Sequence, residues 1–147
     1  MRLNLDCIRA LLLCVEEHSA PNKNPIQFVN LNLSQKVSEM IGTYEKPSPQ
    51  QEKLLETFTN DDIIYSLDYC LEAGLLHSFN ASGRGQQIYH IVDLTVKGHD
   101  FLGNIRYKNI YEKVKAVTEE LGAQSLPAIT QIASSVMSEI IKAHILQ

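Results

Sequence analysis

The chain has 147 residues, of which 44% are hydrophobic and 20% are charged, a composition typical of an ordinary globular protein. This length supports one domain, or one domain with a helical extension. The net charge of -4 at pH 7 argues against generic binding of nucleic acids, which depends on Lys and Arg side chains that neutralise phosphates. The acids are concentrated in residues 43–76, which hold seven acidic and only two basic side chains.

The first part of the chain predicts a helix, a strand and a second, shorter helix. Apolar residues at helical spacing, with Asn4 or Asp6 as the N-cap, predict a helix over residues 5–18. Residues 26–33 nearly alternate between apolar and polar side chains and predict a short strand. Ser34 then fits the N-cap of a short helix.

The central helix is the best-defined element of the sequence. A loop with two prolines, residues 43–51, leads through a short helical segment over residues 52–58 to a helix over residues 59–74. Thr59 fits the N-cap, acids in the first turn interact favourably with the helix dipole, and Gly74 fits the end. Its buried face is predicted to consist of Ile63, Ile64, Leu67, Cys70 and Leu71.

A hairpin and three helices are predicted after the central helix. Two β-type runs, residues 75–79 and 88–95, flank a glycine-containing segment that suits a hairpin tip. Thr95 fits the N-cap of the next helix, in which Gly98 permits a close backbone approach. This helix carries Phe101, Leu102 and Ile105 on one side, and two further helices are predicted over residues 107–121 and 125–146.

The order of these elements predicts the fold class. A helix followed by a hairpin is the arrangement in which a winged helix presents its DNA-reading element. The predicted class is α+β, mainly helical, with a winged helix-turn-helix-like core over residues 1–105 and a C-terminal helical extension over residues 106–147. We expect the two parts to form one cooperative unit.

The last predicted helix carries a long apolar stripe that must be buried against another surface. Two partners are open: the protein's own first helix, or the same helix of a second copy in a homodimer. The predicted dimer seam consists of Ile129, Ile132, Val136 and Ile140.

Four segments of the chain carry a family resemblance. LNLDCIRALLLCVEE, DDIIYSLDYCLEAGLL, DLTVKGHDFLGNIR and SLPAITQIASSVMSEII occur in this order and cover most of the chain outside residues 19–58. Together they resemble an uncharacterised phage-associated family, a domain of unknown function encoded in bacteriophages and prophages. The resemblance implies a winged-helix-like core, a helical C-terminal extension and an origin in a mobile element, and it implies no catalytic residue. The segment over residues 33–58 is longer than the segment that usually joins the first strand to the central helix in this family.

The sequence offers no arrangement of residues for catalysis or metal binding. Its five histidines form no H-E-x-x-H motif, and its three cysteines form no C-x-x-C pair, so neither zinc nor a disulfide framework is predicted. No P-loop and no G-x-S-x-G motif is present. We therefore expect a non-enzymatic protein without a cofactor. Lacking an evident signal peptide or membrane span, it is expected in the cytoplasm of a bacterial host.

With catalysis not expected, the remaining class of function is binding to a macromolecule, and a protein partner is the preferred hypothesis. The central helix contains no Lys or Arg, and its outward face is acidic and carries two tyrosines one helical turn apart. Tyrosine is enriched in interface hot spots, and an acidic face suits a basic host or phage protein. The predicted interaction residues are Asp62, Tyr65, Ser66, Asp68, Tyr69 and Glu72.

The alternative hypothesis is a dimeric DNA-binding transcriptional regulator. In that case the central helix enters the major groove, although its first turn presents acids to the phosphates. Positioning contacts would come from the hairpin tip and from a basic cluster near the predicted helix over residues 107–121. The predicted contact residues are Arg84, Arg106, Lys108, Lys113 and Lys115.

Overall fold

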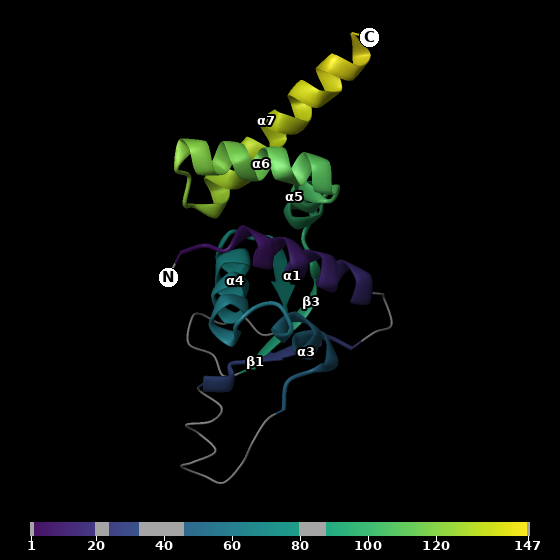
Figure 1. Cartoon of the computed structure of the whole chain (residues 1–147). Helices are drawn as coiled ribbons and strands as arrows, with labels where there is room; N and C mark the ends of the chain where they lie inside the picture. The colour runs from purple at the N-terminus through teal and green to yellow at the C-terminus, as the bar shows by residue number, and fades with distance from the viewer. Residues whose placement is uncertain (1, 20–23, 33–45, 80–87, 147) are drawn as a thin grey trace.

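The computed structural model describes residues 2–19, 24–32, 46–79 and 88–146, which form a mainly helical α+β fold with a small antiparallel sheet (Figure 1). The described helices are α1 (Leu5–His18), α3 (Pro49–Leu55), α4 (Asn60–Glu72), α5 (Val96–Ile105), α6 (Lys108–Leu121) and α7 (Leu126–Ile145). The strands are β1 (Ile26–Val29), β2 (Leu76–Ser78) and β3 (Ile88–Leu94). The predicted helix after Ser34 and the predicted hairpin tip lie outside the described residues.

Side-chain caps explain where the helices begin. Asn4 accepts a hydrogen bond from the N–H of Cys7, and Thr59 accepts one from Asp62, so both predicted starts are confirmed. The helix predicted over residues 52–58 instead begins at Pro49. The reason is local, since Ser48 caps this helix and Pro49 occupies its first turn, where a missing N–H costs nothing.

The sheet has the order β1-β3-β2, and both pairings are antiparallel. Leu76 pairs with Leu94, so the two strands predicted as a hairpin do pair with each other. Ile26 pairs with Ile91 on the other side of β3. The first strand ends at Val29, earlier than predicted. At this residue the side chain of Gln51 accepts a hydrogen bond from the backbone N–H and donates one to the backbone carbonyl.

One hydrophobic cluster joins all parts of the described fold. It contains the largest fully buried side chains of the sheet, Phe28 and Tyr89, together with residues of α1, α4, α5 and α6. Leu126, Ile129 and Ala133 of α7 belong to it as well. In Figure 1, α5, α6 and the first half of α7 form one layer beside α1, while α4 and the sheet lie on the other side of α1. No described helix is both long and apolar enough to cross a membrane.

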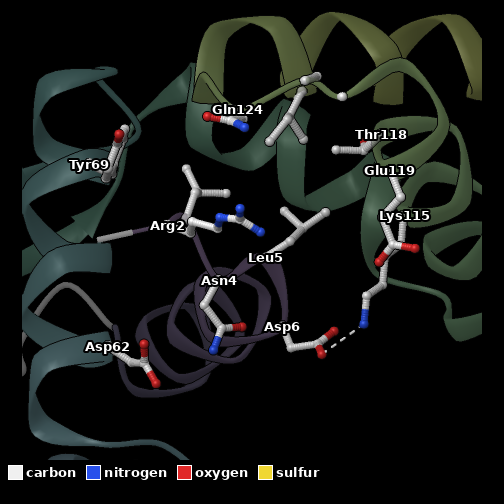
Figure 2. Close-up of a pocket in the computed structure, with 14 residues that line it drawn as sticks. Arg2, Asn4, Leu5, Asp6, Asp62, Tyr69, Lys115, Thr118, Glu119 and Gln124 are labelled. Carbon is white, nitrogen blue, oxygen red and sulfur yellow. Dashed lines mark hydrogen bonds and ion pairs between the residues drawn. The ribbon is translucent and has the colours of Figure 1, made fainter.

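Polar contacts fix α1 against the junction of α5 and α6. Arg9 donates from Nε to the carbonyl of Ile105 at 2.8 Å and from Nη2 to that of Arg106 at 2.5 Å. Asp6 accepts hydrogen bonds from Tyr111 and from Lys115, the latter at 2.9 Å (Figure 2).

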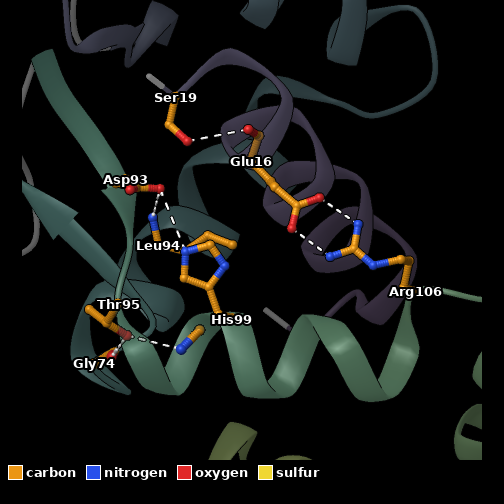
Figure 3. Close-up of polar contacts among 9 residues, drawn as sticks. Glu16, Ser19, Gly74, Asp93, Leu94, Thr95, His99 and Arg106 are labelled. Atoms are coloured by element: carbon orange, nitrogen blue, oxygen red, sulfur yellow. Dashed lines mark hydrogen bonds and ion pairs between the residues drawn. The ribbon is translucent and has the colours of Figure 1, made fainter. Parts of the chain in front are cut away.

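A bidentate ion pair lies at the other end of α1. Both Nη atoms of Arg106 contact the carboxylate of Glu16 at 2.5 Å (Figure 3). Such a fork arrangement is the strongest geometry for an ion pair between Arg and a carboxylate. None of these contacts was predicted, because their partners are about 90 or more residues apart in the sequence.

The start of α5 lies directly against the end of α4. The N–H of Thr95 donates to the carbonyl of Leu75 at 3.0 Å, and its hydroxyl donates to that of Gly74 at 2.5 Å (Figure 3). A Cβ atom on Gly98 would lie 2.1 Å from the same Leu75 oxygen. The close approach predicted for Gly98 is therefore confirmed.

The carboxylates on α1 predict acid sensitivity. Burial raises the pKa of Asp6, but the hydrogen bonds from Tyr111 and Lys115 outweigh it and hold this pKa below its usual value. The hydrogen bond from Arg106 likewise lowers the pKa of Glu16. When folding lowers the pKa of a carboxyl group, its contribution to stability is fully present at a pH above the pKa in the unfolded chain, which is about 4. This contribution is lost as the pH falls through the lower pKa of the folded state. We expect the free energy of unfolding to decrease below about pH 4.

Urea denaturation followed by circular dichroism at pH 7, 4 and 3 checks this prediction. We expect the variant Asp6→Asn/Glu16→Gln to be less stable at pH 7 by roughly 0.5–2 kcal/mol, the sum of two partly exposed pairs, and to depend less on acid. The matched control is Glu112→Gln/Glu120→Gln, which changes two exposed acids of α6. An unchanged pH dependence in the first variant would show that the two contacts contribute nothing.

Candidate functional site

The outward face of α4 carries five of the six predicted interaction residues at positions that reach solvent. Glu72 is exposed and the other four are partly buried; the five are Asp62, Tyr65, Asp68, Tyr69 and Glu72. Ser66 was placed wrongly on this face. Only 2% of Ser66 is exposed, because it lies on the side of α4 that packs against α1. There its side chain forms a hydrogen bond with the side chain of Cys7. We refer to the remaining five residues as the α4 face.

The two tyrosines of the α4 face contact each other. Their ring centroids are 4.6 Å apart with an interplanar angle of 70°, an edge-to-face arrangement. The hydroxyl of Tyr65 donates to that of Tyr69 at 3.0 Å. Tyr69 also packs against the hydrophobic core, so the pair is held in place. A preorganised aromatic pair loses little conformational entropy when a partner binds.

One acid of the α4 face is tied to the sheet. The hydroxyl of Tyr89 donates to Oδ1 of Asp68 at 2.8 Å, which leaves Asp68 partly buried and gives it a structural role. Asp61, one residue before the face, accepts a hydrogen bond from the side chain of Asn32 at 2.8 Å. No residue of α4 is basic. The charge that α4 presents to a partner is therefore negative.

The predicted DNA-contact residues do not form one basic surface. Arg84 lies outside the described residues. Arg106 is paired with Glu16 and Lys115 with Asp6, so two of the four remaining cations are neutralised within the chain. Lys108 and Lys113 are exposed on α6. Two separate lysines are a weak footprint for phosphate binding.

The predicted dimer seam is partly used inside the chain. Ile129 is 1% exposed and belongs to the core, and Ile132 and Val136 pack partly against it. The main partners of α7 are α5 and α6 rather than α1, because α6 and α7 follow each other across a short turn. Ile140 is partly buried, and the C-terminal end of α7 projects away from the body of the fold (Figure 1). The apolar side chains exposed on this projecting part are Ile141, Ile145 and Leu146.

Two buried cysteines and one histidine outside the α4 face have environments that suit a structural role. Burial raises the pKa of the Cys7 thiol to about 11 and also raises that of the Cys70 thiol, so both stay protonated and unreactive at neutral pH. The Nε2 of His99 lies 4.0 Å from Oδ1 of Asp93 at the start of α5 (Figure 3). Among the described residues, no group of three or more His, Cys, Asp or Glu side chains is arranged for a metal ion.

The fold defines a mainly helical α+β protein with a three-stranded antiparallel sheet. A family model described as "Hypothetical protein (DUF2513)" matches residues 2–124, and the chain therefore belongs to this family of an uncharacterised domain of unknown function. The match ends just before α7. No curated protein and no solved structure matches the chain. The resemblance to a domain of unknown function is thus confirmed, and its phage association stays a prediction.

Proposed function

We propose that the protein is a non-enzymatic winged-helix module, encoded by a phage or prophage, that binds another protein through the α4 face. The described elements from α1 to β3 follow the order helix, strand, helix, helix, strand, strand, with β3 in the centre of the sheet, and this supports the winged-helix part of the proposal. In that arrangement α4 takes the position of the recognition helix.

One observation carries the choice of a protein partner: α4 presents acids and a tyrosine pair, and no base. Phosphates are repelled by such a surface, since the first turn contains Asp61 and Asp62. A basic protein surface is attracted to it, and the two tyrosines provide rigid apolar area for the centre of an interface. The chemistry of the partner is therefore a positively charged surface with an apolar centre.

Pull-down from the bacterial host tests this proposal. We expect the native chain to recover a partner that Tyr65→Ala/Tyr69→Ala loses, because each tyrosine hot spot contributes about 2 kcal/mol, or roughly thirtyfold in affinity. The control His77→Ala/Val92→Ala changes two exposed residues of the sheet and should retain the partner. Circular dichroism shows whether each variant is folded. Equal recovery by both folded variants would contradict a role of the α4 face.

A dimeric DNA-binding regulator is the second candidate, favoured by the projecting part of α7 and by the exposed Lys108 and Lys113. Fluorescence anisotropy with random and native phage DNA at low salt discriminates the two. Micromolar binding that weakens steeply with salt and is reduced in Lys108→Gln/Lys113→Gln would favour DNA. Light scattering tests the dimer, and a monomer at tens of micromolar would remove it.

A further inference from the structure

A cavity of about 660 Å³ lies beside the α4 face. It is formed where the N-terminus of α1, one side of α4, the last turns of α6 and the start of α7 meet (Figure 2). Its volume is within the range of about 300–1,000 Å³ that small-ligand sites occupy. Asp62 and Tyr69 of the α4 face line it, so the cavity and this face are continuous.

The charges around the cavity leave an unpaired negative excess. Lys115 and Asp6 both line the cavity but form an ion pair with each other. The carboxylates of Asp62 and Glu119 line it as well, and neither has a hydrogen bond or salt bridge to any described residue. Glu119 does interact electrostatically with Lys115, since it contributes to the raised pKa of that amine. Among the described residues of the wall, the one further charge belongs to Arg2, which is exposed. Apart from the ion pair, the charged groups of the wall are thus two carboxylates and one exposed guanidinium, and their net charge is negative.

The end of α6 adds to this negative potential. The helix dipole places partial negative charge at a helix C-terminus, and the last turn of α6 contains no basic residue to offset it. Glu119 and the left-handed cap residue Gly122, which belong to this end, line the cavity. At the opposite wall the positive end of α1 is already met by the Asn4 cap and by Asp6 in the first turn.

A buried hydroxyl on the cavity wall lacks a partner. Only 7% of Thr118 is exposed, and its Oγ1 is buried without a hydrogen bond to any described residue. Leaving such a group unsatisfied is unfavourable, so an unsatisfied group in a native fold points to an additional donor or acceptor. Oγ1 itself has less than 1 Å² of accessible surface, so a ligand in the cavity supplies this partner when the Thr118 side chain turns its hydroxyl towards it.

We propose that this cavity binds the guanidinium group of an arginine side chain on the partner protein. A guanidinium is planar, carries five donors that suit two carboxylates, and stacks on an aromatic ring such as Tyr69. Figure 2 draws the chain's own Arg2 guanidinium among the lining side chains, where it competes with the incoming group. This inference rests on the proposed function only in assigning the arginine to a protein partner.

Nuclear magnetic resonance titration of the isotope-labelled chain with N-acetylarginine amide tests the proposal. We expect chemical-shift changes confined to the cavity wall and a dissociation constant on the order of 1 mM, as suits one small group in a partly open site. N-acetylcitrulline amide is the matched probe, because it has nearly the same shape without the charge. It should bind at least roughly tenfold more weakly.

Variants assign the contacts. Asp62→Asn and Glu119→Gln should each weaken binding of the arginine probe about tenfold, the effect of one charge-assisted hydrogen bond. Thr118→Val should weaken it about threefold or more without lowering the thermal midpoint, because the hydroxyl has no partner in the folded chain. Arg2→Ala should strengthen binding severalfold, because it removes the competing cation.

Opposite outcomes overturn the inference. Equal binding of the citrulline probe, or no shift changes at tens of millimolar arginine probe, would show that the cavity does not recognise a guanidinium. Binding of N-acetylglutamate amide that is lost in Arg2→Ala would instead make it an anion site. The proposed function fails separately: the arginine probe can bind while Tyr65→Ala/Tyr69→Ala keeps its partner, and the partner can depend on the tyrosines while the probe does not bind.

Discussion

Replacing Gly98 by Ala is expected to destabilise the fold by about 3 kcal/mol or more, since overpacking costs 1–3 kcal/mol and here the obstacle is backbone. The new Cβ would lie 2.1 Å from the carbonyl oxygen of Leu75. That oxygen is held by the N–H of Thr95 at 3.0 Å, so moving it breaks the contact between the end of α4 and the start of α5. Urea denaturation followed by circular dichroism measures the loss, because the chain has no Trp for fluorescence.

Gly103→Ala is the matched control on the same helix. Gly103 is exposed, and nothing lies within 4 Å of the Cβ that it would gain. Alanine is a better helix former than glycine, so this variant should be more stable by about 0.5–1 kcal/mol. The same substitution on one helix is thus expected to have opposite signs. A loss of stability below about 1 kcal/mol in Gly98→Ala would mean that α5 can move away from Leu75 at little cost.

Local chemistry explains which parts of the fold were predictable. Thr59 and Thr95 are followed by apolar residues at helical spacing, and both cap helices that begin where predicted. The strand pairing after Gly74 follows from β-type runs on either side of a glycine-containing segment. Each of these signals lies within a few residues of the structure that it determines.

The missed features depend on residues far apart in the sequence. Ser66 follows the polar pattern of an outward position, yet α1 covers it, and only the crossing of two helices decides that. In the sequence, Arg106 and Lys115 belong to a basic cluster with no acid to pair with nearby, since each acid that pairs with them in the fold is about 90 or more residues away. The cavity was not predicted either, since its wall combines the first residues of the described chain with α4 and α6.

The side chain of Gln51 replaces a missing strand at the edge of the sheet. Gln51 is fully buried, and its Nε2 donates to the carbonyl of Val29 at 2.7 Å while its Oε1 accepts from the N–H of Val29 at 2.8 Å. Gln51→Leu removes both partners and leaves two buried backbone groups unsatisfied, at about 1–3 kcal/mol each. We expect a loss of about 2–5 kcal/mol, measured by urea denaturation, whereas Glu52→Leu at the exposed neighbour should change little.

Gln51→Glu distinguishes the paired hydrogen bonds from simple packing. The carboxylate can still accept from the N–H of Val29, but its second oxygen would face the carbonyl of Val29 and repel it. Protonation restores a donor at that oxygen, so the pKa of the introduced carboxyl should be raised in the folded state. The stabilising contribution of the protonated carboxyl group is then fully present at a pH below its pKa in the unfolded chain, about 4.3, and is lost as the pH rises through its pKa in the folded state. We therefore expect the deficit of Gln51→Glu relative to the native chain to be large at pH 7 and to shrink towards pH 4, while that of Gln51→Leu stays constant. Parallel pH profiles for the two variants would mean that Gln51 acts by filling space alone.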